Sequence, residues 1–192
     1  TSSPIVLLVG GSSQLGKTIS KHLTDLNYRV YSSFLSHPIP TSPNLIPILL
    51  DITKPSSCQK VIQTILTKEG QVDILINAAG VTSQNLEKAL QTNTIGPYNL
   101  MQEIIPFMKK RNSGQIINIT SLSGLVSFPG FGPYSASKFA LAALTSAVHY
   151  ELESYNIRVT NLASGAILDS HIPLPPNSAR ARLWPLKILL PF

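Results

Sequence analysis

Tyr134 and Lys138 stand four residues apart in the segment Tyr-Ser-Ala-Ser-Lys. Residues at this spacing share one face of a helix, so the phenol and the ammonium are predicted to be neighbours. A nearby ammonium favours phenolate and lowers the pKa of a tyrosine from about 10 toward neutrality. Such a phenol can donate a proton in a reaction. A pair of this kind that stood alone would more often be an incidental surface contact.

Two further polar residues precede the pair. Ser121 follows the predicted strand 116–119 and comes 13 residues before Tyr134, and Asn93 comes 28 residues before Ser121 in a segment with a helical pattern. The Tyr and Lys pair therefore does not stand alone. Asn93, Ser121, Tyr134 and Lys138 are the candidate catalytic residues.

A glycine-rich turn occupies residues 10–16, Gly-Gly-Ser-Ser-Gln-Leu-Gly, between an apolar run and an amphipathic segment. Glycines let the backbone approach a pyrophosphate, and the start of the following helix supplies free N–H groups and positive potential. The turn therefore predicts a nucleotide site.

The same region also fits a second pattern. Gly11 to Thr18 matches the phosphate-binding loop Gly-x-x-x-x-Gly-Lys-Thr formally. In that interpretation the chain would hydrolyse a nucleoside triphosphate and would need a magnesium-binding Asp at the end of another buried strand, a place that Asp51 could fill. The rest of the chain has to decide between the two interpretations.

Apolar runs and helical patterns alternate along most of the chain, which predicts an α/β fold with a parallel sheet. The predicted strands are 5–9, 28–34, 46–52, 72–76, 116–119 and 157–162, and the predicted helices are 15–26, 58–68, 86–111 and 134–154. A proline-rich loop at 37–47 replaces one crossover helix. We expect one doubly wound, Rossmann-type domain with strand order 3-2-1-4-5-6 and a dinucleotide at the carboxyl ends of the strands.

The composition supports a folded domain and excludes several classes of site. Of the 192 residues 43% are apolar and 12% are charged, which argues against disorder. One cysteine, Cys58, and four scattered histidines predict neither an internal disulfide nor a metal site. The net charge of +6 is spread along the chain, so we expect no nucleic-acid partner.

Nothing in the hydropathy pattern predicts a membrane span of about 20 apolar residues. No basic leader followed by an apolar core is visible either. We therefore expect the protein to reside in the cytoplasm or the mitochondrial matrix.

Taken in order, the motifs resemble those of the short-chain dehydrogenase/reductase family, most closely its 3-oxoacyl-(acyl-carrier-protein) reductase and carbonyl reductase branch. The resemblance runs from Ile5 to about Ser170. It rests on the glycine turn, Asp51-Ile52, Asn77-Ala78-Ala79-Gly80, Asn93, Ser121, and Tyr134-x-x-x-Lys138. Six motifs in the family's order are more specific than one loop pattern, so the dinucleotide interpretation outweighs the triphosphatase.

The resemblance implies a role for each candidate. Tyr134 would protonate the carbonyl oxygen as hydride arrives, and Ser121 would polarise that carbonyl. Lys138 would hold the nicotinamide ribose and tune Tyr134, and Asn93 would anchor a water of a proton relay. Asp51 would bond the adenine, unless it only stabilises a helix start near Thr53. The implied cofactor-binding residues are Gly10, Ser12, Ser13, Gln14, Leu15, Gly16, Ser33, Phe34, Asp51, Ile52, Asn77, Ala78, Ala79, Gly80, Tyr134, Lys138, Gly165 and Ile167.

The chain departs from the family's pattern in several places. Gln14 stands at the central glycine of the turn, where its side chain could crowd the pyrophosphate, and Val9 stands at the preceding threonine. The family's Pro-Gly after strand six is Ser164-Gly165, and its nicotinamide-binding threonine is Asp169. We expect the family's usual last helix and strand to be lacking. We therefore divide the chain into a reductase domain, 1–170, and a proline-rich irregular tail, 171–192.

The predicted cofactor preference follows from the absence of an acidic residue near the end of the second predicted strand. NAD-selective folds place a carboxylate about 20 residues beyond the glycines to bond the ribose 2′-hydroxyl. Phe34 occupies that position by alignment, and no Asp or Glu lies between Asp25 and Asp51. Nearby hydroxyls such as Ser33 could bond a 2′-phosphate, which predicts NADP(H) over NAD(H). The possible cations are Lys17, Arg29 and His37. Alternatively, Phe34 packs on the adenine and either cofactor is accepted.

We therefore expect NADPH-dependent reduction of a carbonyl, a 3-oxoacyl thioester that is free or carried on an acyl carrier. Relatives pair through two long helices, here 90–110 and 134–154, so a homodimer is expected. The alternative is a weak or inactive dinucleotide-binding protein that acts through a partner in a dimer or hetero-oligomer. Gln14 and Asp169 favour this alternative, whereas the four intact catalytic candidates favour the enzyme.

Overall fold

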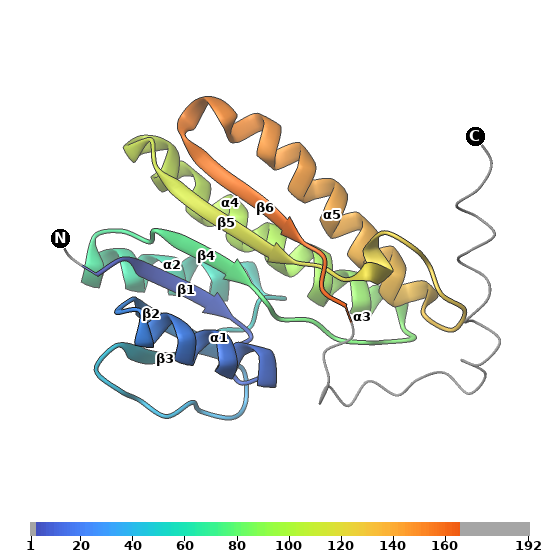
Figure 1. Cartoon of the computed structure of the whole chain (residues 1–192), viewed down its shortest axis with the longest axis horizontal. Helices are drawn as coiled ribbons and strands as arrows, with labels where there is room; N and C mark the ends of the chain where they lie inside the picture. Colours follow the sequence, from blue (N-terminus) through green and yellow to red (C-terminus); the bar gives the residue numbers. More distant parts are fainter. Residues whose placement is uncertain (1–2, 166–192) are drawn as a thin grey trace.

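A six-stranded parallel sheet forms the centre of the computed structural model, which describes residues 3–165 (Figure 1). The strand order is β3-β2-β1-β4-β5-β6, and every pairing is parallel, as predicted. The strands are β1 (Ile5–Val9), β2 (Arg29–Phe34), β3 (Leu45–Leu49), β4 (Ile74–Asn77), β5 (Gly114–Ile119) and β6 (Ile157–Leu162). The tail predicted at 171–192, with Ile167 and Asp169 before it, lies outside the described residues.

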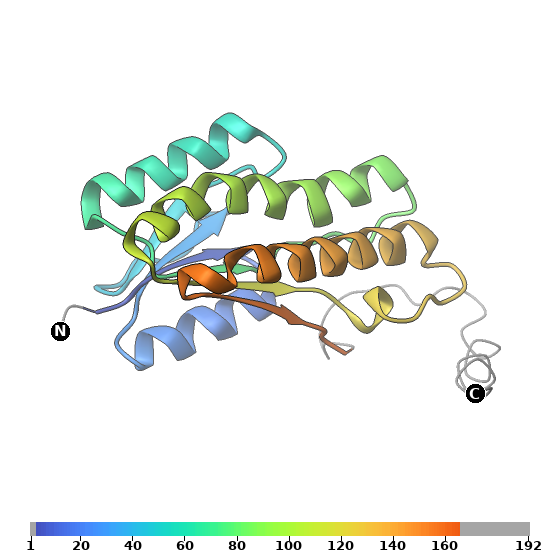
Figure 2. The same ribbon diagram turned by 90° about the horizontal axis from the view of Figure 1, so that it is seen from above.

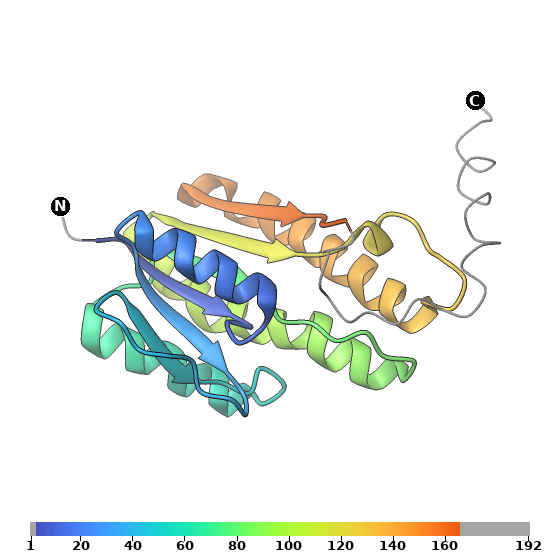
Figure 3. The same cartoon turned by 60° about the horizontal axis from the view of Figure 1, so that its bottom comes forward.

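Helices cover the two faces of the sheet unequally. The helices α2 (Pro55–Glu69), α4 (Gly96–Arg111) and α5 (Gly132–Leu152) lie on one face, and α1 (Gln14–Asp25) lies on the other (Figure 2). Figure 3 shows α1 close to β1, while none of the described helices lies in front of β6 on that side. The β2–β3 connection has no helix, as its prolines predict. Among the described helices, none is both long and apolar enough to cross a bilayer.

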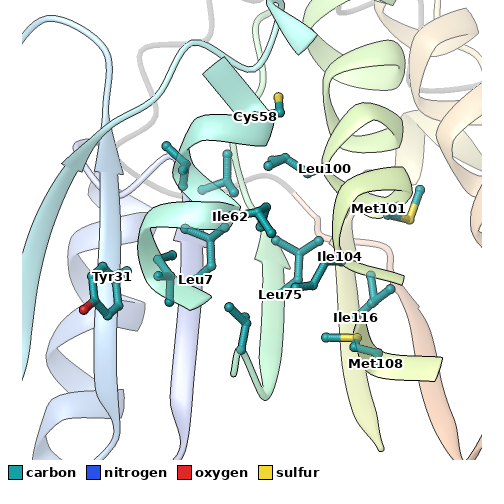
Figure 4. Close-up of a cluster of buried hydrophobic side chains, with 14 of the residues drawn as sticks. Leu7, Tyr31, Cys58, Ile62, Leu75, Leu100, Met101, Ile104, Met108 and Ile116 are labelled. Carbon is teal, nitrogen blue, oxygen red and sulfur yellow. The ribbon is translucent and has the colours of Figure 1, made fainter. Parts of the chain in front are cut away.

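The larger apolar core lies between the sheet and α2, α4 and α5. Successive strand residues alternate between faces, so Leu7 belongs to this core while Leu8 packs on the α1 side. Ile62 of α2 and Ile104 of α4 gather over Leu75 of β4 (Figure 4). Strands that are buried on both faces read as continuous apolar runs, which is why β1 could be predicted from the sequence.

The predicted helix 86–111 is interrupted in the structure. It consists of α3 (Leu86–Leu90), a π-helical turn, η1 (Gln91–Ile95), and α4. In η1 the Gly96 amide donates to the carbonyl of Gln91, five residues back. Pro97 follows and has no N–H to donate to the Asn93 carbonyl, so the α-helical ladder cannot continue there. The segment 86–111 is helical, as predicted, and Pro97 explains why one turn of it is π-helical.

Candidate active site

The structure brings Tyr134 and Lys138 together on the first turns of α5. The Lys138 Nζ atom lies 5.8 Å from the centroid of the Tyr134 ring. Lys138 is 4% exposed, and its Nζ donates a hydrogen bond of 3.1 Å to the carbonyl of Ile119, the last residue of β5. Burial disfavours the charged form and lowers the pKa of Lys138 to about 8. A buried, anchored lysine beside a phenol is not an incidental surface pair.

Ser121 lies two residues beyond this anchor, at the carboxyl end of β5. It begins the short 3-10 turn η2 (Leu122–Gly124), and its Oγ accepts a hydrogen bond of 3.1 Å from the Ser123 amide. The turn packs closely on α5, because a Cβ built on Gly124 would lie 2.9 Å from the Lys138 carbonyl oxygen. Ser121 and Lys138 are therefore positioned by the same strand end.

Asn93 lies in η1 and is fully buried. Its Oδ1 accepts from the Val81 amide at 2.7 Å, and its Nδ2 donates to the Val81 carbonyl at 2.9 Å and to Ser137 Oγ at 2.9 Å. Both amide hydrogens are used within the protein. A Cβ on Gly80 would lie 3.3 Å from both Asn93 Oδ1 and Lys138 Nζ, so these three residues meet. Pro97 leaves the Asn93 carbonyl without its α-helical donor.

The glycine turn lies at the carboxyl end of β1, against the segment that follows β4. Gly10 has a φ of 88°, and a Cβ there would lie 2.7 Å from the Ala79 amide nitrogen. The Gly10 amide donates to Ser33 Oγ at 3.0 Å, which ties the end of β2 to the turn. A Cβ on Gly16 would collide with the Gly10 carbonyl oxygen. The backbone is thus packed so closely that neither Gly10 nor Gly16 has room for a Cβ atom.

Ser13 caps α1 directly after the turn. Its Oγ accepts from the Gly16 amide at 3.0 Å and donates to the Gly10 carbonyl at 2.8 Å. Within the described part of the chain, the amides of Gln14 and Leu15 have no protein acceptor, and Gln14 itself is exposed. Two amides and the positive end of the helix dipole can therefore bind a phosphate group, so the cradle fits a dinucleotide.

We expect Gly16→Ala to destabilise the fold and to weaken dinucleotide binding at least tenfold. Overpacking of this kind lowers the free energy of unfolding by about 1–3 kcal/mol. Each kcal/mol of lost stability lowers the melting temperature of a domain of this size by roughly 2–4 °C. Gly132→Ala is the matched control, because no atom lies within 4 Å of a Cβ built there. Thermal melts and cofactor titrations check both variants, and a Gly16→Ala protein that melts and binds like the parent would contradict the assigned turn.

Asp51 and Ile52, which follow β3, both make contacts within the protein. Asp51 Oδ1 accepts from the Thr53 hydroxyl at 2.6 Å and from the Thr53 amide at 3.1 Å. The Thr53 hydroxyl, together with Lys54, holds the pKa of Asp51 below its usual value. Ile52 is buried, and a Cβ on Gly96 would lie 2.7 Å from its Cγ1. One Asp51 oxygen therefore stabilises the turn into α2, and the adenine contact of Asp51 stays a prediction.

Asn77, the last residue of β4 and the first of the Asn-Ala-Ala-Gly motif, begins a buried polar chain. Its Nδ2 donates to Asn118 Oδ1 at 2.8 Å, and Asn118 Nδ2 donates to Thr145 Oγ1 at 2.9 Å. The Oδ1 of Asn77 is buried without a hydrogen-bond partner in the described structure. Sequence reasoning missed this chain. The only signal for it was a pair of asparagines inside otherwise apolar strands.

Gly165 lies at the same end of the sheet, whereas Arg29, one of the possible cations, does not. Ser164 follows β6, and its carbonyl accepts from the Leu122 amide at 2.9 Å, which brings Gly165 beside the Ser121 turn. The prediction that Arg29 could be a cation for the 2′-phosphate was wrong. Arg29 begins β2, at the amino ends of the strands, and donates a hydrogen bond of 2.8 Å to Glu69 Oε1. The described residues contain no group of three or more His, Cys, Asp or Glu side chains that could hold a metal.

Comparisons with solved structures give the same architecture. A short-chain dehydrogenase from Streptomyces avermitilis superposes with a TM-score of 0.79 at 28% identity, over 86% of this chain and 67% of that chain. ElxO with NADP bound superposes with a TM-score of 0.79 at 26% identity, over 85% of this chain and 73% of that chain.

Sequence comparisons extend the likeness to curated proteins. A 3-ketodihydrosphingosine reductase of Bacteroides thetaiotaomicron is 30% identical over 170 residues, which cover 84% of this chain and 63% of the relative. The 3-oxoacyl-(acyl-carrier-protein) reductase FabG of Thermotoga maritima is 31% identical over 143 residues, 70% of this chain and 58% of the relative. The matches thus span less than two thirds of these two relatives. Residues 4–173 match the profile described as short chain dehydrogenase, and the chain belongs to that family.

Proposed function

We propose that this protein binds a nicotinamide dinucleotide, preferentially NADP(H), and reduces a carbonyl with Tyr134 as the proton donor. The observation that carries the proposal is the buried Lys138, which is held by the end of β5 and lies beside the Tyr134 ring. Burying an ammonium is unfavourable, and such arrangements cluster at functional sites. The glycine turn and the capped start of α1 supply a phosphate cradle at the same edge of the sheet.

Each candidate residue would have a separate role in the reaction. The bound cofactor would supply the hydride. Tyr134 would donate its phenolic proton to the carbonyl oxygen, and Ser121 would donate a hydrogen bond to that oxygen. The Lys138 ammonium, which exists below about pH 8, would stabilise the phenolate that remains and would bond the ribose. The Asn93 carbonyl would hold the water that returns a proton toward Lys138.

Two relatives support a particular substrate class. The names 3-ketodihydrosphingosine reductase and 3-oxoacyl-(acyl-carrier-protein) reductase both describe a ketone at the third carbon of the substrate. We propose a 3-oxoacyl thioester as substrate. The test follows the absorbance of NADPH in the presence of 3-oxoacyl thioesters, simple cyclic ketones and a buffer control. Turnover of cyclic ketones alone would contradict the thioester and leave carbonyl reduction in place.

NADPH is expected to bind at least fivefold more tightly than NADH. Phe34 ends β2 at the cofactor edge, and the nearby Ser36 Oγ and His37 Nδ1 atoms lie 2.9 Å apart, so hydroxyl and imidazole groups flank the position without a carboxylate. Phe34→Asp should invert the preference, because its carboxylate repels a 2′-phosphate and bonds a 2′-hydroxyl. Fluorescence titration with both reduced cofactors measures the two dissociation constants.

The control for Phe34→Asp adds the same charge elsewhere. Leu26 follows α1, at the end of the sheet opposite the proposed cofactor site, and is 57% exposed. Leu26→Asp should therefore leave the ratio of the dissociation constants for NADPH and NADH unchanged. Added salt should weaken NADPH more than NADH if a cation meets the extra phosphate. Tighter NADH binding by the parent protein would overturn the proposed preference.

The second candidate function is a dinucleotide-binding protein of weak or no activity that acts through a dimer. Exposed apolar side chains on α4 and α5 favour a dimer through these helices: Phe107 is 38% exposed, Phe139 41% and Tyr150 73%. Tight NADPH binding without turnover of any ketone in the same assays would favour this candidate over the enzyme.

A further inference from the structure

Ser137 receives hydrogen bonds from two consecutive residues of η1. Asn93 Nδ2 donates to Ser137 Oγ at 2.9 Å, and Thr94 Oγ1 donates to the Ser137 carbonyl oxygen at 2.8 Å. Ser137 Oγ in turn donates to the Tyr134 carbonyl at 2.7 Å. All three of these polar side chains are buried. One residue of α5 is thus bonded to η1 at both its side chain and its backbone, and to the backbone of Tyr134.

The π-helical turn makes this double contact possible. Consecutive residues of an α-helix point about 100° apart, since the helix has 3.6 residues per turn. A π-helical turn has more residues per turn, so Asn93 and Thr94 point in more similar directions and both reach Ser137. Pro97 prevents a regular α-helix from forming at this point. Such π-turns often occur at functional sites, and this one bonds directly to the helix that carries Tyr134.

The catalytic end of α5 depends on these bonds more than the rest of the helix does. The buried residues of its first two turns are Ser135, Ser137 and Lys138, whereas the apolar residues Leu141, Val148 and Leu152 are buried farther along. Ser135 Oγ has no hydrogen-bond partner in the described structure and cannot help. Buried apolar side chains of α5 therefore hold its distant part, whereas the part next to the site is held by hydrogen bonds of buried polar side chains and by the packing of η2 on the Lys138 backbone.

We propose that Thr94 and Ser137 are positioning residues, whose hydroxyls fix the rotation of the start of α5 and thereby set Tyr134 and Lys138 against the end of β5. This inference rests on the proposed function, because it assigns the pair its task in proton donation. Ser137 lies between Tyr134 and Lys138 in sequence, so a rotation of the helix at Ser137 would move both side chains. A displacement of about 1 Å at a reacting group can lower the rate about a hundredfold.

Thr94→Val and Thr94→Ser separate the hydroxyl from the shape of the side chain. Valine keeps the volume of threonine and removes its donor, and serine keeps the donor. We expect Thr94→Val to lower kcat tenfold to a hundredfold while KM for the ketone changes less than threefold. Thr94→Ser should restore kcat to within threefold of the parent. A purely structural role would lower the melting temperature of Thr94→Val but leave kcat of the folded fraction unchanged, and that result would overturn the proposal.

A second readout does not depend on enzymatic activity. Trace labelling with an amine-specific reagent, read by mass spectrometry, reports how accessible each lysine is. The buried Lys138 should label slowly in the parent, several-fold faster in Thr94→Val, and slowly again in Thr94→Ser, with exposed Lys60 as the internal reference. If the parent reduces no ketone, the proposed function fails, and the labelling of Lys138 alone decides the positioning role.

Ser137→Ala gives an independent test of the same contact. It removes the bonds to Asn93 and to the Tyr134 carbonyl, and it should likewise lower kcat and speed the labelling of Lys138. It serves in place of Thr94→Val if that variant does not fold. Unchanged kcat and unchanged Lys138 labelling in a folded variant would overturn the proposal, and so would a failure of both variants to fold, since the hydroxyls would then be needed for folding itself.

Discussion

Tyr134→Phe should lower the turnover number by about 10²- to 10⁴-fold, the range typical for loss of a general acid. The phenyl ring keeps its edge contact with Phe131, whose centroid lies 6.3 Å away, so the variant should fold normally. The dissociation constant for NADPH should change by less than about threefold, because the phenolic proton acts mainly in the transition state.

The control for this variant is Tyr150→Phe, on the same helix. Tyr150 is 73% exposed and lies four turns from the site, so its hydroxyl should be dispensable. Steady-state rates and cofactor titrations on both variants measure the two effects. Retained turnover in Tyr134→Phe would show that another group donates the proton.

Lys138→Met should abolish activity and make the protein more stable near pH 7. The pKa of Lys138 falls from 10.5 to about 8 on folding because the ammonium is desolvated. Below about pH 8 both the folded and the unfolded chain carry the proton, so the folded state bears this cost in full. The difference between these two pKa values corresponds to about 3 kcal/mol of folding free energy that the parent loses. Loss of the hydrogen bond to Ile119 in the variant offsets about 1 kcal/mol of the resulting gain in stability. We expect a net gain of about 2 kcal/mol.

The pH dependence of this gain has a definite sign. Between about pH 8 and 10.5 the unfolded chain binds the Lys138 proton and the folded chain does not, so the parent becomes more stable as the pH rises through this window. The advantage of Lys138→Met should therefore shrink from pH 7 to pH 10. Urea unfolding of parent and variant at pH 7 and at pH 10 measures this difference in stability. Lys60→Met, at an exposed lysine, is the control. A variant less stable than the parent at pH 7 would show that the folded site stabilises the ammonium.

Continuous apolar runs such as Ile5–Val9 predicted the strands, because they mark strands that are buried on both faces. The strand order was predicted from the dinucleotide-binding fold that the glycine turn and the resemblance imply. The sequence predicted the third strand too far toward Ile52, because Leu50 and Ile52 are buried although the strand ends at Leu49. Their burial comes from the turn held by Asp51 and from contact with α4. A run of buried residues therefore indicates a strand only where a neighbouring strand continues to pair with it.

For the site, spacing alone placed Tyr134 and Lys138 together, since both belong to one helix. It could not reveal which atoms hold Lys138, because Ile119 lies 19 residues away and acts through its backbone carbonyl. The contacts of Ser137 with Asn93 and Thr94 also join residues more than 40 positions apart. Contacts of this kind depend on a π-turn that side-chain periodicity does not encode, although Pro97 gave a local hint of it.

The strand order also constrains how the chain folds during synthesis. The central pair of the sheet joins β1 to β4, with Val9 opposite Asn77, 68 residues later. A ribosome that adds 5–20 residues per second needs about 3–14 s to make that stretch. During this interval β1, β2 and β3 can assemble with α1, but one edge of β1 lacks its neighbour and exposes backbone groups that favour aggregation. The nascent amino-terminal half is therefore the stage at which a chaperone would have most to protect.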